Sequence, residues 1–291
     1  MNQLAVNPQT EQQLAHICAE PPHALLLTAG DGMGKTALAR WCIARILGID
    51  ESTVSSSPQC KIIAPGEKAT SLSIDDIRQL QQFVKLRTVG TARIRRAILI
   101  EHADTLTVEA QNALLKLLEE PPADTILILT AAEAHTLLPT IRSRVQTLAI
   151  NRPDRATLEE FFGAQFAPAA VAQAYFLSGG LPGLLSALLA DEKHPLLASV
   201  QNAKQLLQED SFSRLAHLDQ YAKQKTEAIR LCNALQRMSQ AALEQAAAKQ
   251  GTAALKRWHG IYKAAYAAEQ QLQNNGSTKL VLTQLVLQLS S

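Results

Sequence analysis

The chain has 291 residues, which at about 100 to 200 residues per domain suggests two or three domains. With 47% hydrophobic and 19% charged residues it can bury a large core, which excludes an intrinsically disordered chain and a collagen-like polymer. The formal net charge of +2 is too small to indicate a nucleic-acid-binding protein by itself.

The first predicted elements are a strand, a loop and a helix. The apolar run Ala24–Thr28 predicts a short strand and leads into a glycine-rich turn. Apolar residues then follow at helical spacing over Thr36–Leu47, and Gly48 is typical of a helix end. Further short apolar runs predict strands at 61–63, 97–100, 125–130 and 145–150. Strands that alternate with helical segments indicate a parallel α/β sheet.

The clearest helix is predicted over Val108–Glu119. Thr107 is suited to cap its first turn, and its leucines and alanines recur on one face. Pro121 and Pro122 are expected to end it. Earlier in the chain, the serine-rich segment Glu51–Pro58 predicts a surface loop.

Strand patterns stop after Pro153, and the rest of the chain is predicted to be helical. Breaks near 150 and 192 suggest three domains, an α/β domain at 1–150, a small helical domain at 151–192 and a larger helical domain at 193–291. The last region holds 12 Lys plus Arg and 6 Asp plus Glu, a net +6, against −4 for residues 1–192. This excess fits a solvated helical surface or a contact with DNA, and the sequence leaves both open.

No apolar stretch reaches the roughly 20 residues of a membrane helix, and residues 1–10 lack the basic-then-apolar order of a signal peptide. We therefore expect a cytoplasmic protein with no membrane partner. The four cysteines form no CxxC pair and no ligand cluster with histidine, so we expect thiols and assign no metal: Cys18, Cys42, Cys60 and Cys232.

A candidate phosphate loop joins the first strand to its helix. There, backbone N–H groups and the helix dipole favour a phosphate group. The loop approaches the GxxxxGK[ST] pattern, with Ala29 in place of its first glycine. Its candidate nucleotide-binding residues are Gly30, Asp31, Gly32, Met33, Gly34, Lys35 and Thr36. The alternative is a structural glycine turn.

Nucleotide hydrolysis also needs an acidic residue at the end of a nearby strand to hold Mg²⁺. The strand at 97–100 ends in Glu101 and His102. Glu101 would need to adjust its longer side chain to reach a metal. His102 stands where a carboxylate base is expected and is a weaker candidate for that role; the favoured alternative is a hydrogen-bonded histidine at the strand end. The residues therefore favour ATP binding without efficient hydrolysis and leave a role for Mg²⁺ open.

Several motifs in order resemble the bacterial DNA polymerase III clamp-loader family, most closely its delta-prime subunits. The resemblance spans about residues 7–190, and its most specific block runs from Asn112 to Pro122, NALLKLLEEPP. It implies an AAA+ P-loop parallel sheet domain, a helical lid domain and an all-α collar that assembles five subunits into a ring. The implied partners are the other loader subunits and, through the complex, a sliding clamp and primed DNA.

The chain departs from the hydrolysing members of this family in three places. Glu101 and His102 replace an Asp-Glu pair, Ala132 stands at the sensor position close to Thr130, and Pro182 aligns with the lid arginine. Ser143-Arg144 is similar to the family's Ser-Arg-Cys motif, whose arginine completes a neighbouring subunit's ATP site. The resemblance thus implies that Arg144 is an arginine finger acting in trans. A structural surface arginine is the alternative.

These observations favour a clamp-loader subunit in DNA replication that hydrolyses ATP poorly or not at all. One rival is an autonomous AAA+ ATPase, such as a hydrolysing loader subunit or a DNA motor, which the Lys35-Thr36 pair favours and Pro182 opposes. Another is a DNA-binding repair or regulatory module that uses the +6 region. Only 4% of the residues are aromatic, which leaves few platforms for stacking on bases.

Overall fold

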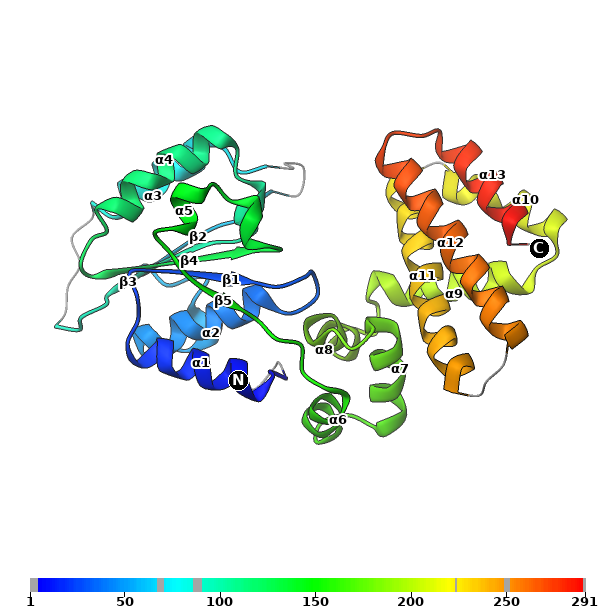
Figure 1. Cartoon of the computed structure of the whole chain (residues 1–291), viewed down its shortest axis with the longest axis horizontal. Helices are drawn as coiled ribbons and strands as arrows, with labels where there is room; N and C mark the ends of the chain where they lie inside the picture. Colours follow the sequence, from blue (N-terminus) through cyan, green and yellow to red (C-terminus); the bar gives the residue numbers. More distant parts are fainter. Residues whose placement is uncertain (1–4, 67–70, 86–90, 223, 249–251, 290–291) are drawn as a thin grey trace. The chain divides into compact units, whose positions relative to one another are not determined.

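A computed structural model describes residues 5–66, 71–85, 91–222, 224–248 and 252–289 (Figure 1). The chain divides into two compact units. The first comprises Met1–Phe161 together with Leu181–Leu184, and the second comprises Phe162–Gly180 together with Leu185–Ser291. The domain boundaries expected near 150 and 192 stay predictions.

The first unit is built on a five-stranded sheet in which every pairing is parallel. The order across the sheet is β2-β3-β4-β1-β5. The strands are β1 (Ala24–Thr28), β2 (Cys60–Ile63), β3 (Arg96–Ile100), β4 (Thr125–Ala131) and β5 (Gln146–Ala149). All five agree with the predicted strands within one or two residues, and the predicted parallel α/β sheet is confirmed.

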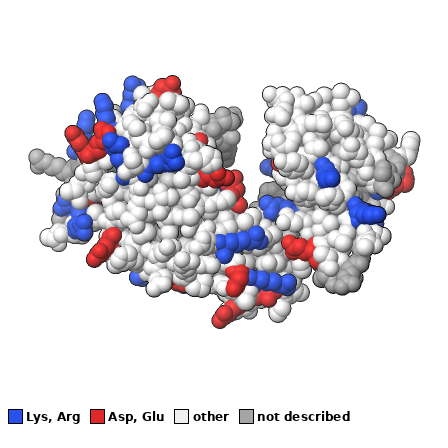
Figure 2. Space-filling view, in the orientation of Figure 1, with Lys and Arg blue, Asp and Glu red and all other residues white. Residues whose placement is uncertain are grey.

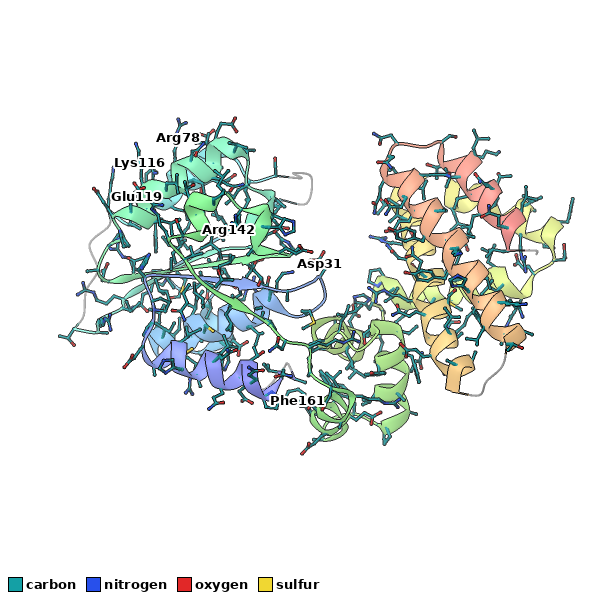
Figure 3. All side chains as sticks on the ribbon, viewed as in Figure 1. Asp31, Arg78, Lys116, Glu119, Arg142 and Phe161 are labelled. Atoms are coloured by element: carbon teal, nitrogen blue, oxygen red, sulfur yellow. The ribbon has the colours of Figure 1, made fainter. Side chains whose placement is uncertain are left out.

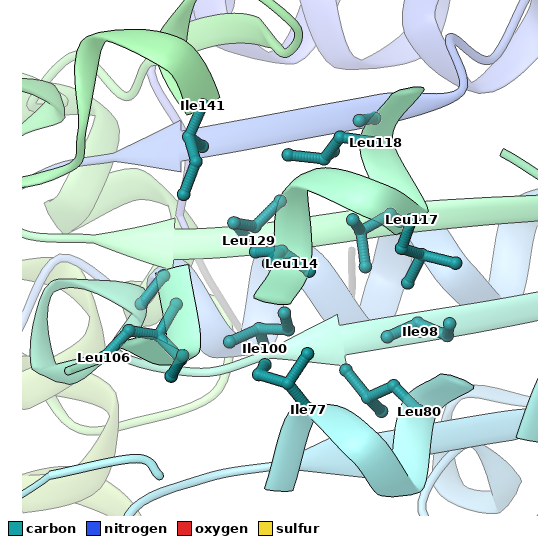
Figure 4. Packing of buried hydrophobic residues seen from close by; sticks show 14 of the residues in the cluster. Ile77, Leu80, Ile98, Ile100, Leu106, Leu114, Leu117, Leu118, Leu129 and Ile141 are labelled. Carbon is teal, nitrogen blue, oxygen red and sulfur yellow. The ribbon is translucent and has the colours of Figure 1, made fainter. Parts of the chain in front are cut away.

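Helices cover both faces of this sheet (Figure 1). One face packs against α1 (Pro8–Ala19) and α2 (Lys35–Leu47). The other packs against α3 (Ile74–Phe83), α4 (Val108–Glu119) and α5 (Pro139–Arg142), as Figure 4 shows for α3 and α4. Successive strand residues point to opposite faces, so Leu25 and Leu27 join the first core and Leu26 the second. Burial on both faces explains why the central strands are continuous apolar runs.

The ends of α4 are those that the sequence predicts. The Thr107 side chain accepts a hydrogen bond from the backbone N–H of Ala110 at 3.2 Å, and the helix ends at Glu119. Gln111, which is buried on this helix, accepts a hydrogen bond from the Leu138 N–H at 2.8 Å. Leu138 is the residue before α5, so this bond fixes the start of α5 on the first unit.

A buried ion pair fixes the start of β3. Arg96 lies 2.6 Å from Asp124, which precedes β4, and it also donates to the backbone carbonyl of Val84 at 2.6 Å. Asp124 is shared with Arg95 at 3.2 Å. These bonds tie the beginnings of two central strands to the end of α3, opposite the edge where β1 and β3 lead into the candidate site.

The described part of the second unit is helical, as the sequence predicts after Pro153. Its longest helices, α11 and α12, pack against each other, and α13 packs on α10 and α12. The helices after β5 are α6 (Arg155–Gly163), α7 (Pro168–Ser178), α8 (Pro182–Ala190), α9 (Pro195–Gln208), α10 (Ser211–Ala222), α11 (Lys225–Ala248), α12 (Thr252–Gln273) and α13 (Thr278–Gln288). Among the described helices, none combines the length and the apolar character needed to cross a membrane.

Candidate functional site

The candidate phosphate loop connects β1 to α2, as predicted. Gly32 and Gly34 have φ angles of 81° and 83°, a left-handed conformation that glycine adopts without steric cost. Gly34 is the N-cap of α2, and no side chain caps the helix there. The first amides of α2 are therefore not occupied by a side-chain acceptor, and an uncapped helix start is where a phosphate group binds well.

Lys35 is buried at the start of α2, with 6% of its surface exposed. Its Nζ donates to the backbone carbonyls of Ala29 at 2.6 Å and Gly30 at 3.3 Å. It also pairs with Asp31 Oδ1 at 3.2 Å, although the Asp31 side chain is 85% exposed at the tip of the loop (Figure 3). The ammonium group is thus bonded to the loop itself, and these bonds would have to break for the lysine to contact a phosphate.

The segment Leu181–Leu184 lies against the same loop within the first unit. The Leu184 N–H donates to the Gly32 carbonyl at 3.0 Å. A Cβ added to Gly183 would lie 2.7 Å from Gly34 N and 2.8 Å from Gly32 O, so only glycine fits here. The backbone of Gly183 therefore closes over the amide of Gly34, one of the groups expected to face a phosphate.

The acidic strand end lies beside α2. Glu101, at the end of β3, is 9% exposed and forms an ion pair with Arg40 of α2 at 2.9 Å. His102 follows in a left-handed conformation, φ 53°, and its backbone N–H donates to the Thr130 hydroxyl at 3.0 Å. The Glu101 carboxylate is thus paired with an arginine, and the Thr130 hydroxyl helps to hold the turn after β3. A carboxylate engaged in an ion pair is less available to a metal ion.

Arg144 follows the short helix α5. Its guanidinium donates to the Thr140 carbonyl at 2.9 Å and pairs with Glu119, the last residue of α4, at 2.9 Å. The side chains of Arg144 and Glu119 are 36% and 49% exposed, so this is a surface ion pair worth about 0 to 1 kcal/mol. The contact joins the Asn112–Pro122 block, which contains Glu119, to the Ser143-Arg144 pair.

The sequence prediction brought together the loop and the Glu101 strand end but missed two groups at the site. The Arg40 partner of Glu101 carries no recognisable signal, because an arginine on an amphipathic helix is commonplace. The contact of Gly183 with Gly34 depends on long-range packing, which no local pattern in the sequence indicates. In the described ranges, no three His, Cys, Asp or Glu side chains are placed to hold a metal ion.

The family model described as DNA polymerase III, delta subunit, matches residues 6–154, about half of the chain. The chain belongs to this family. The match takes in the loop, Glu101, α4 and Arg144, and the resemblance inferred from these motifs is confirmed.

Among curated relatives of this family member, the DNA polymerase III subunit delta' of Pseudomonas aeruginosa is 34% identical over 183 residues, 56% of this chain and 55% of the relative. The subunit of that name from Escherichia coli is 30% identical over 57% of this chain and 54% of its own length. The chain thus spans about half the length of the curated relatives it matches.

A solved structure shares the fold over nearly the whole chain. It is a DNA polymerase III gamma subunit-related protein from Thermotoga maritima, with a TM-score of 0.64 and 18% identity, covering 97% of this chain and 98% of that one. At this identity the likeness concerns the fold alone. It agrees with the expected P-loop sheet domain followed by helices.

Proposed function

We propose that this chain is a clamp-loader subunit of the bacterial DNA polymerase III holoenzyme, where it helps ATP-driven loading of a sliding clamp onto primed DNA. The family match over residues 6–154 carries the proposal. The proposed partners are the other subunits of a five-membered ring, with clamp and DNA reached through the complex. The helices after residue 192 supply the collar in this proposal.

The proposed cofactor is ATP, held by the loop from Gly30 to Thr36. The uncapped start of α2, the two left-handed glycines and the Lys35 ammonium suit the phosphate groups. The nucleotide supplies the energy of the cycle when it binds, and this chain's part is to hold it. Lys35 must first leave the carbonyls of Ala29 and Gly30.

This subunit is proposed to hydrolyse ATP poorly by itself. Glu101 is paired with Arg40, and Ala132 and Pro182 offer no polar group at the positions where hydrolysing members of the family use one. An autonomous ATPase would need a free carboxylate to hold Mg²⁺ and position the water. The Lys35-Thr36 pair is compatible with that rival, but the ion pair at Glu101 opposes it.

Arg144 is the proposed contribution to catalysis, as an arginine finger in a neighbouring subunit's ATP site. Its guanidinium lies on the surface and is held by a weak ion pair, so it can exchange Glu119 for a phosphate oxygen. Arginine fingers supplied in trans stabilise transition-state charge and are worth about 10³ to 10⁵ in rate at one site.

The test is Arg144→Ala in a loader reconstituted from purified subunits. We expect the variant to assemble normally and to lower the DNA-stimulated ATPase rate and the clamp-loading rate of the complex. Arg142→Ala is a matched control, because Arg142 is an exposed arginine two residues away. Full activity of the Arg144→Ala complex would refute the finger, and failure of the wild-type chain to join the complex would refute the proposed function.

A further inference from the structure

The outward face of α12 carries a stripe of cationic, aromatic and amide side chains. Lys256, His259, Lys263, Tyr266 and Gln270 are all exposed. Their spacing of three, four, three and four residues places them on one side of the helix. We call these five residues the α12 stripe. At 1.5 Å per residue it extends about 21 Å along the helix.

The opposite side of α12 is its packing face. Ile261, Ala264, Ala265, Ala268 and Leu272 are buried, and α12 packs closely on α11 and also contacts α13. Burial of this face orients the helix, so the stripe faces away from the core of the second unit. In Figure 2, the surface over α12 carries blue side chains on a white background.

Aromatic residues are concentrated on this helix. The chain has 2 Trp and 4 Tyr in 291 residues, and Trp258, Tyr262 and Tyr266 lie within α12. The rings of Tyr262 and Tyr266 are stacked, with centroids 6.4 Å apart and an interplanar angle of 8°. Tyr266 is 49% exposed, so part of this aromatic pair is accessible to solvent. Exposed, ordered aromatic rings are platforms on which nucleic-acid bases stack.

Glu269, the sole acidic residue within α12, is turned toward α11. Its carboxylate accepts a hydrogen bond from Gln236 of α11 at 2.6 Å and another from Gln273 at 3.1 Å. The pKa of the Cys232 thiol on α11 is raised mainly by burial, and the negative charge of Glu269 raises it further. Among the described residues, Lys256 and Lys263 have no ion-pair partner. The stripe therefore presents cations that no acid within α12 offsets.

We propose that the α12 stripe binds single-stranded nucleic acid. Lys256 and Lys263 are about 10 Å apart along the helix axis, close enough to contact nearby phosphates of one strand. The exposed ring of Tyr266 stacks on a base, and Gln270 and His259 add hydrogen-bonding groups. An acidic peptide would match the charges but would leave the accessible tyrosine ring without a stacking partner. The inference is independent of the nucleotide and of the arginine finger.

Fluorescence anisotropy of a labelled oligo(dT) of about 16 nucleotides, with the full chain, tests this proposal. Tyr266→Ala is expected to weaken binding about 5- to 150-fold, the range for loss of one stacked base. Lys256→Ala with Lys263→Ala is expected to reduce the slope of log affinity against log salt by about 1.4, which corresponds to two single-strand phosphate contacts.

Lys193→Ala with Lys204→Ala is the matched control, because it removes the same charge from two exposed lysines outside α12. Circular dichroism melting checks that each variant is folded. The proposal is overturned if the chain does not bind the oligonucleotide, if the control pair lowers the slope equally, or if folded Tyr266→Ala binds as well as wild type. Equal affinity for polyglutamate would assign the stripe to an acidic protein partner and would also overturn it.

Discussion

The contact between Gly183 and the phosphate loop leads to a sharp prediction for the variant Gly183→Ala. The new Cβ would lie 2.7 Å from Gly34 N and 2.9 Å from Gly34 Cα, so the crowded atoms are backbone and cannot rotate away. Forcing an extra methyl group into a packed site costs about 1 to 3 kcal/mol. The segment Leu181–Leu184 must therefore shift, and the hydrogen bond from the Leu184 N–H to the Gly32 carbonyl weakens.

We expect this shift to raise the affinity for nucleotide. In the structure, the backbone of Gly183 lies over the Gly34 amide, and we call this the closed form. If the closed form competes with phosphate at Gly34, destabilising it by about 1 to 3 kcal/mol increases the apparent affinity for ATP by up to about 5- to 150-fold. The full increase is expected only when most of the nucleotide-free protein is in the closed form. Calorimetric titration of ATP into wild type and Gly183→Ala measures the difference directly.

Two further variants make the result interpretable. Gly163→Ala is the control substitution, since a Cβ there meets nothing within 4 Å. Adding Lys35→Ala to Gly183→Ala should remove the gained affinity, because the ammonium that contacts the phosphates is lost. A folded Gly183→Ala protein that binds ATP no more tightly than wild type would show that the segment does not compete with the nucleotide.

Two other predictions concern stability and thiol reactivity. Asp124→Ala leaves buried Arg96 without its partner at 2.6 Å and should lower the free energy of unfolding by about 3 to 5 kcal/mol in urea titrations; a loss below 1 kcal/mol would contradict this. A hydrogen bond from the Cys42 thiol lowers the pKa of Cys18, whereas burial raises the pKa of Cys232 to about 12. The Cys18 thiolate therefore persists to lower pH, and mass spectrometry after an iodoacetamide pulse should show Cys18 alkylated well before Cys232 across pH 7 to 9. Earlier labelling of Cys232 in the folded protein would refute the assignment.

Local patterns in the sequence determined most of the first unit. The helix Val108–Glu119 was predicted to the residue, because a threonine cap, a leucine stripe and two following prolines all act within a few residues of one another. Buried strands such as β4, predicted over 125–130 and observed over Thr125–Ala131, follow from continuous apolar runs, which is what burial between two helical layers requires. The glycines of the phosphate loop likewise report a local backbone need, φ near +80°.

Only the tertiary structure decided how the site residues are paired. Arg40 and Glu101 are 61 residues apart in the chain, Arg144 follows α5 whereas Glu119 ends α4, and Gly183 reaches the loop from a distant segment. Such contacts depend on how the helices are laid over the sheet, and no local propensity encodes that placement. The sequence by itself thus determined which chemical groups the site contains. Long-range packing decided that the Glu101 carboxylate is already paired with an arginine, whereas the bonds of Lys35 stay within its own loop.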